Sequence, residues 1–383
     1  MSYWTKGSSL GDDERLAWLR LIRSDGVGPR TFRGLVDRFG SPVAALDALP
    51  RLHREGGRAL HVCTREEAQA EFEACAKQGI VFVAITEKSY PLALAATADA
   101  PPLIALRGDP AVLARPMVGI VGSRNASALG LRFAERLARE LGEAGFTIVS
   151  GLARGIDARA HGASLASGTV AVLAGGHEHI YPNENRPLLE RIVENGAALS
   201  EMPLTWEPRG RDFPRRNRIV SGLSHGVIVI EAARGSGSLI TARFALEQGR
   251  EVFAVPGNIT SKMSWGPNLL IKAGGAKLVQ EWSDVTDELP AAIRRELVVR
   301  AQQQLLPGEG DAVLAASAGP EEPLKALARK LLNCLQVDVP KQFESLVESF
   351  QEVSSSELIG ALFDLEMSGL VRQLPGKNFV KVW

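Results

Sequence analysis

The sequence is poor in cysteine, has no excess of either charge and contains no long apolar run. Its 383 residues include only Cys63, Cys75 and Cys334, which are scattered and form no CxxC pair. Neither a disulfide framework nor a zinc site is therefore indicated. Lys plus Arg and Asp plus Glu both total 44, so any nucleic-acid partner would have to bind a local basic patch.

Membrane and export signals are also missing from the pattern. The first residues, MSYWTKGSSLGDDERL, lack the apolar segment of a signal peptide, and no stretch reaches membrane-spanning length. We therefore expect a protein of the reducing cytoplasm that has no membrane partner.

What the chain does contain, between about residues 76 and 290, is a series of short apolar runs that end at glycine or a small polar residue. The runs are VFVAIT, MVGIVGS, FTIVSG, TVAVLAGG, VIVIEA and EVFAVPG. Helical patterns such as LRFAERLARELGEAG lie between them. Continuously apolar strands that alternate with helices predict an α/β fold with a parallel sheet covered on both faces. Ligands of such sheets bind beyond the carboxyl ends of the strands.

The flanking segments differ from this α/β region. Residues 1–75 have helical patterns, and Gly26-Val27-Gly28 followed by Pro29 predicts a tight turn between two helices. This arrangement resembles a helix-hairpin-helix, whose turn amides can bind a DNA phosphate; the alternative is a packed helical module that binds nothing. Residues 291–320 are rich in Gly, Ala and Pro and are expected to be a linker. Residues 321–383 have helices followed by a hairpin, which suggests a winged helix.

Three strand-to-helix turns combine glycine, hydroxyl groups and arginine. They are Gly122-Ser123-Arg124, the turn from Ser150 and Gly151 through Arg154 to Gly155, and Gly235-Ser236-Gly237-Ser238 after Arg234. Glycine lets the backbone approach a ligand closely, and amides at helix N-termini attract anions, so these turns predict phosphate binding. None has the GxGxxG spacing of a dinucleotide site or a Walker lysine. The prediction therefore depends on all three turns lying at one edge of the sheet.

The most basic stretch is DFPRRNR, Asp212 to Arg218. From Trp206 to Arg218 five arginines stand against one Glu and one Asp, a local excess of +3. The stretch follows the strand-like AALS and is expected to open the helix RNRIVSGLS, where arginine opposes the helix dipole. Because that placement does not favour the helix, we interpret the stretch as a binding site for phosphates and bases, with a solvated helix end as the alternative. The residues predicted to bind them are Phe213, Arg215, Arg216, Asn217 and Arg218, with Trp206 as a second residue that could stack on a base.

Other polar clusters do not predict catalysis. Asp157 and His161 could share a helix face, but no nucleophile is tied to them, and Asp157 is expected to brace its own turn. His177-Glu178-His179 lacks a third metal ligand at a recognisable spacing, so we interpret it as loop polarity. We expect no catalytic residue, no metal and no cofactor.

Many collinear motifs resemble the DNA-processing protein A (DprA/Smf) family. They are VGIVGSRNAS, IVSGLARGIDARAH, AVLAGGHEHIYPNEN, ALSEMP, FPRRNRIVSGLS, VIVIEA, GSGSLITARFALEQGREVFAVPG and GPNLLIKAGGAKLV. The resemblance is strong over about residues 80–280. The N-terminal part is similar to the family's sterile-alpha-motif-like (SAM-like) domain, and the C-terminal part to its winged helix.

This resemblance implies an extended Rossmann-like domain that binds single-stranded DNA and is not an enzyme. Family members protect incoming single strands during natural transformation, load the RecA recombinase onto them and act as dimers. By motif, Gly122 to Arg124 would form a phosphate pocket, and Phe213 with Arg215 to Arg218 would extend the DNA path. Leu269, Leu270 and Ile271 lie where relatives dimerise, and RecA contact is expected nearby.

Two positions depart from the family pattern. His177-Glu178-His179 stands where relatives usually have a Gly-Leu-Asp-like turn before Tyr-Pro, and Gly274-Gly275-Ala276 carries one residue more than the usual Gly-Ala.

Two other functions remain as alternatives. A Rossmann-like phosphoribohydrolase would resemble Pro-Gly-Gly-x-Gly-Thr followed by a catalytic glutamate, whereas here Gly235 to Ser238 continues into Leu239-Ile240. A duplex-binding regulator would use the winged helix. The helix from Ser354 to Ser368 carries three acidic residues and no Lys or Arg, so DNA phosphates would repel it. We therefore expect a protein contact there, or a wing contact through Arg372, Lys377 and Lys381.

Overall fold

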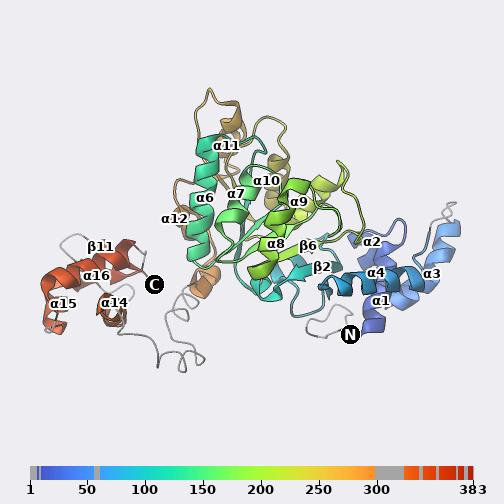
Figure 1. The fold of residues 1–383 in the computed structure, drawn as a ribbon, viewed down its shortest axis with the longest axis horizontal. Coiled ribbons are helices and arrows are strands. Elements are labelled where there is room, and N and C mark those ends of the chain that lie inside the picture. The colour runs from blue at the N-terminus through green and yellow to red at the C-terminus, as the bar shows by residue number, and fades with distance from the viewer. Residues whose placement is uncertain are drawn as a thin grey trace. The chain divides into compact units, whose positions relative to one another are not determined.

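The chain folds into two compact units, Met1–Leu297 and Val298–Trp383 (Figure 1). The computed structural model describes residue 7 and residues 10–55, 61–297, 323–335, 340–350, 353–367, 370–374 and 378–382. Of the predicted linker 291–320, residues 291–297 are helical and the remainder lies outside the described residues. In the described parts of the chain, no helix has the length and hydropathy needed to cross a bilayer.

The first unit is built on a sheet whose strands run in the order β1-β2-β6-β5-β4-β3-β7-β8-β9. The strands are β1 (Ile80–Ala84), β2 (Leu103–Gly108), β3 (Met117–Val121), β4 (Thr147–Ser150), β5 (Thr169–Val172), β6 (Ala197–Ser200), β7 (Gly226–Val229), β8 (Glu251–Ala254) and β9 (Lys277–Leu278). Strands β3 to β9 are parallel, which confirms the α/β prediction.

The first two strands of the sheet, β1 and β2, differ in direction from the prediction. The run VFVAIT was assigned to the parallel sheet, but its strand β1 pairs antiparallel with β2, and β2 pairs antiparallel with β6. Strand β2 is not among the runs from which strands were predicted. The strand β1 is apolar throughout, as a parallel strand buried on both faces would be, although Val81 is exposed to solvent. An apolar run therefore does not show whether a strand is parallel or antiparallel.

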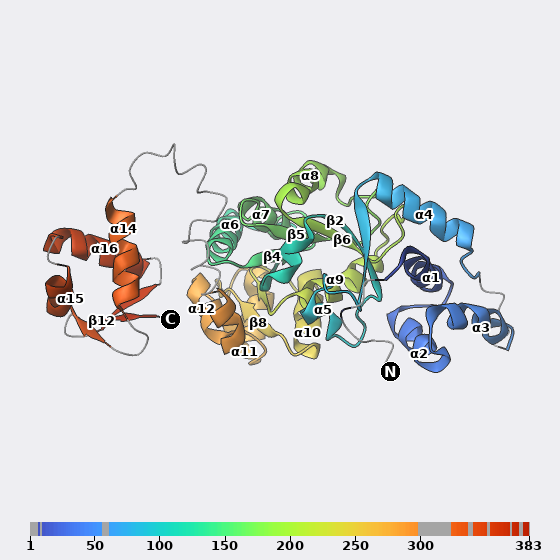
Figure 2. The same cartoon turned by 90° about the horizontal axis from the view of Figure 1, so that it is seen from below.

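Helices cover both faces of the sheet (Figure 2). One face carries α6 (Ala128–Glu143), α7 (Ile156–Ala163), α8 (Arg186–Asn195) and α12 (Trp282–Glu288); the other carries α5 (Leu92–Ala95), α9 (Asp212–Leu223) and α10 (Gly237–Glu247). Successive residues of a strand point to opposite faces. In β3, Ile120 packs in one core with Leu137 of α6, while Val121 packs in the other with Val220 of α9.

Four helices precede the sheet: α1 (Asp12–Arg23), α2 (Pro29–Phe39), α3 (Pro42–Glu55) and α4 (Arg65–Lys77). Trp18 and Phe32 lie at the centre of their core, with ring centroids 5.1 Å apart. Arg23 pairs with Glu71 at 2.8 Å and donates to the backbone oxygen of Glu201, just after β6. These contacts hold the N-terminal helices against the carboxyl edge of the sheet.

The second unit has α14 (Pro323–Cys334), α15 (Phe343–Ser349) and α16 (Ser355–Met367), together with β10 (Lys341–Gln342), β11 (Val371–Leu374) and β12 (Asn378–Lys381). Its three strands form a sheet in the order β10-β12-β11, and Leu331, Leu362 and Phe379 lie in its core. Helices followed by a β-hairpin confirm the winged-helix prediction. Lys377, in the predicted wing, lies outside the described residues.

Candidate nucleic-acid interface

The three glycine-rich turns meet at the carboxyl edge of the sheet, as the sequence predicts. They follow the neighbouring parallel strands β4, β3 and β7. The amide of Ile156 donates to the Ser123 oxygen at 3.3 Å, and Asn217 Nδ2 donates to the Gly237 oxygen at 3.2 Å. The strand β3 lies between β4, which follows it in the chain, and β7, which the chain reaches only after completing β6 on the other side. The turns therefore surround the switch point at which open α/β sheets bind ligands.

The turn after β4 has an unusual backbone conformation that buried side chains maintain. Leu152 has a φ of 56°, which is left-handed and uncommon for a residue other than glycine. Asp157 is buried, and its Oδ2 accepts from the amides of Gly151 at 3.1 Å and Ala153 at 3.4 Å. Asn185 Nδ2 donates to the Leu152 oxygen at 2.9 Å. Asp157 thus braces its own turn, which confirms the prediction.

Arg216 lies beneath this turn rather than on the surface. Its Nη1 donates to the backbone oxygens of Gly151 and Val172, and the side chain is buried. A Cβ at position 151 would overlap the guanidinium, so any other residue there would displace Arg216 from these oxygens. Burial lowers the pKa of Arg216 to about 10, while the neighbouring Asp157 opposes that fall. Burial in turn raises the pKa of Asp157, and Arg216 opposes that rise.

Arg215 and Arg218 share one buried carboxylate, that of Glu201. Arg215 Nε lies 3.0 Å from Glu201 Oε1, and Arg218 Nη2 lies 2.5 Å from Oε2. Arg218 also contacts Asp99, with 3.6 Å between Nε and Oδ2. The Arg215 side chain is 43% exposed, whereas that of Arg218 is 7% exposed. Of the arginines of DFPRRNR, Arg215 alone faces solvent.

The prediction that Arg216 and Arg218 contact phosphate directly therefore needs correction. Helix α9 begins at Asp212, four residues before the predicted start at Arg216. Asp212 Oδ2 accepts from Trp206 Nε1 at 3.0 Å and from the Arg209 amide at 2.9 Å, which fixes this earlier start. The periodicity of the longer helix turns Arg216 and Arg218 toward the protein and Arg215 toward water.

Aromatic rings lie beside arginines around these turns. The Arg124 guanidinium carbon is 5.2 Å from the centroid of the Phe213 ring, and Tyr181 meets Phe213 edge-on at 5.2 Å. Tyr181 is 51% exposed. The Arg234 guanidinium carbon lies 5.7 Å from the Trp265 ring. Tyr181 and Trp265 are not among the predicted site residues. The signal that could have indicated Tyr181 is an aromatic residue in a glycine-rich segment after a strand.

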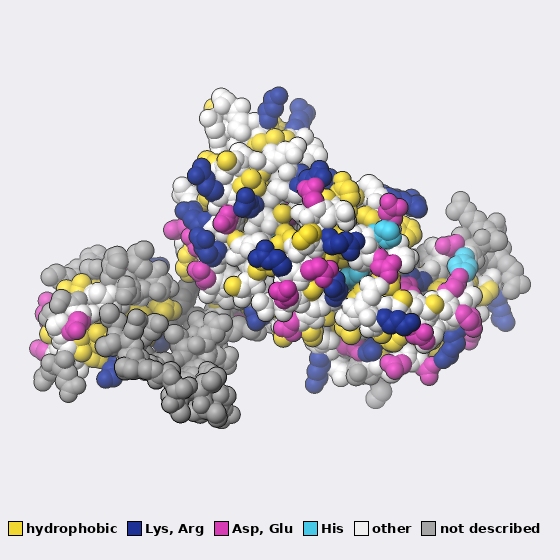
Figure 3. All heavy atoms as spheres, viewed as in Figure 1, with side chains coloured by type: hydrophobic (Ala, Val, Ile, Leu, Met, Phe, Trp, Pro, Cys, Tyr) yellow, Lys and Arg dark blue, Asp and Glu magenta, His cyan; other side chains and the backbone are white. Residues whose placement is uncertain are grey.

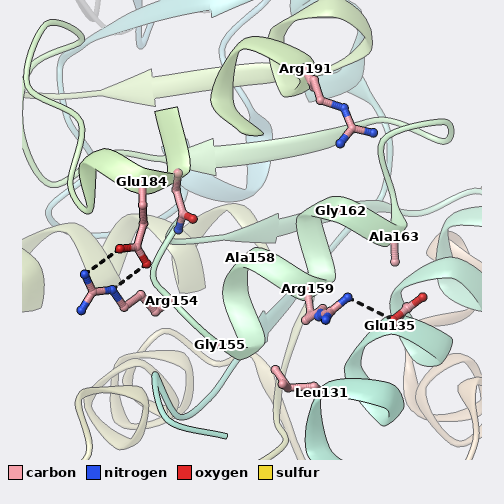
Figure 4. Close-up of a pocket in the computed structure, with 11 residues that line it drawn as sticks. Leu131, Glu135, Arg154, Gly155, Ala158, Arg159, Gly162, Ala163, Glu184 and Arg191 are labelled. Atoms are coloured by element: carbon pink, nitrogen blue, oxygen red, sulfur yellow. Dashed lines mark hydrogen bonds and ion pairs between the residues drawn. The ribbon is translucent and has the colours of Figure 1, made fainter. Parts of the chain in front are cut away.

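Arg154 is exposed but already has a partner. Its Nε and Nη2 each donate to Glu184 at 2.7 Å, and this pairing raises the pKa of Arg154. Figure 4 shows Arg154 facing Glu184 and Arg159 facing Glu135 around a cavity of about 550 Å³, which small residues of α7 also line. A phosphate would have to compete with Glu184 for Arg154.

Several predicted residues shape the turns from inside. Ser150 is buried and donates to the Ile120 oxygen at 2.6 Å, and Ser238 is buried next to Ser236, which caps α10. Gly122 is partly buried, and a Cβ at this position would collide with Ile156. The other predicted site residues are exposed or partly exposed, as Gly122 is: Ser123, Arg124, Arg154, Phe213, Arg215, Asn217, Gly235, Ser236 and Gly237.

The N-terminus of α6 already binds a carboxylate of the protein. Ser127 caps this helix, and Glu231 accepts from the Ser127 amide at 2.8 Å and from its hydroxyl at 2.6 Å. An external anion would therefore bind at the preceding turn, Ser123 and Arg124, and not at this helix end.

Two histidines singled out in the sequence, His161 and His177, are buried and make contacts within the protein. His161 is buried, with Nδ1 2.8 Å from Thr169 Oγ1, and His177 Nε2 lies 3.1 Å from the Ala105 oxygen. Within the described ranges, no group of three or more His, Cys, Asp or Glu residues is placed to hold a metal ion. His177 thus has a structural place in the turn that departs from the family pattern, while His179 is exposed.

The predicted dimerisation segment lies on α11 (Trp265–Lys272) next to β9, the last strand of the sheet. Leu269 is 44% exposed, whereas Leu270 and Ile271 are half-buried. Leu246 of α10 and Leu278 of β9 are similarly exposed. Apolar side chains therefore face solvent on neighbouring elements at this end of the sheet.

Charge on the surface is mixed. Figure 3 shows Lys and Arg side chains interspersed with Asp and Glu side chains over the face in view. Basic groups must consequently act through local arrangements such as the one around Arg124 and Phe213.

The sheet order, the glycine-rich turns at its switch point and the flanking helical and winged-helix parts define an extended Rossmann-type protein. Residues 81–290 match the family of the DNA recombination-mediator protein A, residues 12–74 a DprA-like N-terminal HHH (helix-hairpin-helix) domain and residues 315–377 a DprA winged helix domain. The chain belongs to this DprA/Smf family, and its role is in DNA processing and recombination.

Relatives and solved structures agree with this assignment. The chain is 46% identical over 217 residues to the DNA processing protein DprA of Bacillus subtilis, covering 56% of this chain and 73% of the relative. It is 30% identical over 402 residues to protein Smf of Synechocystis, covering 97% and 99%. The X-ray structure of DprA from Streptococcus pneumoniae matches with a TM-score of 0.61 and 31% identity, over 74% of this chain and 99% of that one. DprA from Helicobacter pylori, described for its single-stranded DNA binding mode, matches with a TM-score of 0.50 and 30% identity, over 54% and 93%.

Proposed function

We propose that the protein binds single-stranded DNA across the turns after β3 and β7 and the exposed side of α9. The observation that carries this proposal is the arrangement of Arg124, Phe213 and Tyr181 at the carboxyl edge of the sheet. A guanidinium binds phosphate, and an exposed ring stacks on an unpaired base of any sequence. The H. pylori relative, described for its single-stranded DNA binding mode, supports the same ligand.

In this proposal the predicted site residues have two kinds of role. Ser123, Arg124, Arg215, Asn217, Ser236 and the glycines 122, 235 and 237 contact the sugar-phosphate chain, and Phe213 with Tyr181 contacts bases. Arg154 joins them when phosphate displaces Glu184. The buried residues Ser150, Gly151, Arg216, Arg218 and Ser238 position the turns that make these contacts.

We further propose that the protein is a binding protein and not an enzyme. It would act in the cytoplasm to protect incoming single strands during natural transformation and to load the RecA recombinase onto them. Support comes from family membership and from Asp157 and His161, which are buried and hydrogen-bonded within the protein instead of facing a substrate.

The first prediction concerns the affinity for oligodeoxythymidine. Phe213→Ala should weaken binding by about 5- to 150-fold, since stacking contributes roughly 1–3 kcal/mol per base. Arg124→Ala should weaken binding and lower the slope of log affinity against log salt by about one phosphate contact. The measurement is fluorescence anisotropy at several salt concentrations, with a blunt duplex for comparison. RecA filament growth on strands coated with single-strand binding protein should fall in parallel.

The matched control is Arg107→Ala. Arg107 pairs with Glu190 much as Arg154 pairs with Glu184, but β2 places it at the opposite edge of the sheet, beside the amino end of β6. Binding by this variant should equal that of the original chain. Equal affinity of the original chain for duplex and single strand, or an Arg124→Ala variant that binds as tightly as the control, would refute the proposal.

We also propose that two copies associate through α11 and β9, where Leu269, Leu246 and Leu278 are exposed. A carboxylate at position 269 would have to be desolvated in such an interface, at a cost of several kcal/mol. Leu269→Glu should therefore convert a dimer to a monomer in sedimentation velocity at micromolar concentration. Leu92→Glu, on exposed α5, should leave the dimer intact. A monomeric original chain, or a dimeric Leu269→Glu variant, would contradict this assignment.

A further inference from the structure

A second cavity, of about 540 Å³, lies between the N-terminal helices and the carboxyl edge of the sheet. One side is the α1–α2 turn from Gly26 to Thr31, and the other contains Asp99, Arg215 and Arg218. The Arg23 hydrogen bond to the Glu201 oxygen and its pairing with Glu71 hold the two sides together. Arg215 therefore borders both this cavity and the DNA-binding surface proposed above.

The charges around the cavity favour an anion. Arg30, Arg215 and Arg218 line it, and Asp99 is the one acidic residue of the lining. Arg218 forms ion pairs with Asp99 and with the buried Glu201, and Glu201 Oε1 also lies 3.0 Å from Arg215 Nε. Three guanidinium groups thus face two carboxylates, and the excess lies with the exposed Arg30 and the 43% exposed Arg215.

The backbone of the turn adds hydrogen-bond donors to this charge. Gly28 is the N-cap of α2 and supplies no capping side chain, and Pro29 occupies the first helical position. The amides of Arg30 and Thr31 belong to the first turn, whose N–H groups have no carbonyl partner within a helix. Both residues line the cavity, as Arg215 does.

We propose that this cavity binds a phosphate of the same DNA strand, so that the N-terminal helices form the second wall of the DNA path. The inference deepens the proposed function and rests on it, because the strand would reach the cavity by passing Arg215. The guanidinium groups of Arg30 and Arg215 and the amides of Arg30 and Thr31 would hold the phosphate. A free phosphate or nucleotide has the same chemistry, so the experiment must separate the two sources.

The experiment measures the affinity of the full chain for oligodeoxythymidines of increasing length. Affinity should rise when the strand becomes long enough to reach from Phe213 to the cavity. Arg30→Glu should remove that rise, leave the shortest bound oligomer unaffected, and weaken the long oligomer by about tenfold with a salt slope lower by about one contact. Arg30→Gln should act in the same direction with a smaller effect. Thermal unfolding of both variants should match the original chain, since Arg30 is exposed.

Arg38→Glu is the matched control, because Arg38 is an exposed arginine in the last turn of the same helix. It should bind all lengths as the original chain does. If Arg30→Glu binds long strands like this control while Arg124→Ala does not, the inference is wrong and the proposed function stands. If neither Arg30→Glu nor Arg124→Ala weakens binding, both are wrong. Binding of inorganic phosphate or thymidine monophosphate that Arg30→Glu abolishes, with unchanged binding of long strands, would assign the cavity to a free anion and overturn the inference.

Discussion

Replacing Arg216 by methionine is expected to destabilise the protein by about 3–5 kcal/mol and to abolish single-strand binding, although the side chain is buried. The substitution leaves the buried Asp157 carboxylate without its neighbouring positive charge and removes the donor to the oxygens of Gly151 and Val172. The turn after β4 would then lose the contacts that hold its left-handed residue, Leu152. Urea unfolding gives the stability, and anisotropy with oligodeoxythymidine below the unfolding transition gives the binding.

Two comparison variants distinguish this explanation from a general loss of charge. Arg215→Met removes an exposed arginine from the same helix and should change stability by no more than about 1 kcal/mol. Combining Arg216→Met with Asp157→Asn removes both buried charges and should recover part of the lost stability, as a double-mutant cycle would measure. An Arg216→Met variant as stable as Arg215→Met, or additive losses in the double variant, would show that the buried charges are not coupled.

Lowering the pH from 7 to 4.5 should also destabilise the protein, and His177→Gln should remove about 2 kcal/mol of that loss. Burial lowers the pKa of His177 to about 4, from 6.5. Below pH 6.5 the unfolded chain binds a proton that the folded chain does not. The stabilisation is therefore complete above pH 6.5 and decreases as the pH falls toward 4. Burial lowers the pKa of His161 to about 3, so that histidine contributes a loss of the same sign.

The adjacent histidine supplies the control for this experiment. His179 belongs to the same His-Glu-His segment but is exposed. His179→Gln should keep the full dependence of the unfolding free energy on pH. The measurement is urea unfolding at several pH values from 7 down to about 4.5, roughly two pH units below the ordinary histidine pKa of about 6.5. The decisive quantity is the change with pH and not the stability at pH 7, because the His177 hydrogen bond to Ala105 is lost in the variant. Identical pH dependence in the two variants would refute the assignment.

Local patterns of the sequence determined much of this protein. Apolar runs that end at glycine predicted the strands β3, β4, β5, β7 and β8, because parallel strands are buried on both faces. Because parallel strands present their carboxyl ends at one edge of a sheet, the same runs predicted that Ser123, Gly151 and Ser236 lie at a common edge. Capping is equally local: the Ser127 hydroxyl caps the start of α6, and the Ser354 hydroxyl accepts from the Glu357 amide at the start of α16.

Only the tertiary structure decided which groups can reach a ligand. The helix start at Asp212 set the phase of α9, and that phase buried Arg216 and Arg218 while exposing Arg215. Partners come from other segments of the chain: Glu201 pairs with Arg215, and Tyr181 contacts Phe213. The turn at Gly28 lines one cavity together with Arg215. The antiparallel direction of β1 and β2 likewise depends on the strands with which they pair. Periodicity and capping depend on neighbours a few residues away and can be recognised in one sequence, whereas burial and pairing depend on which distant segments pack together.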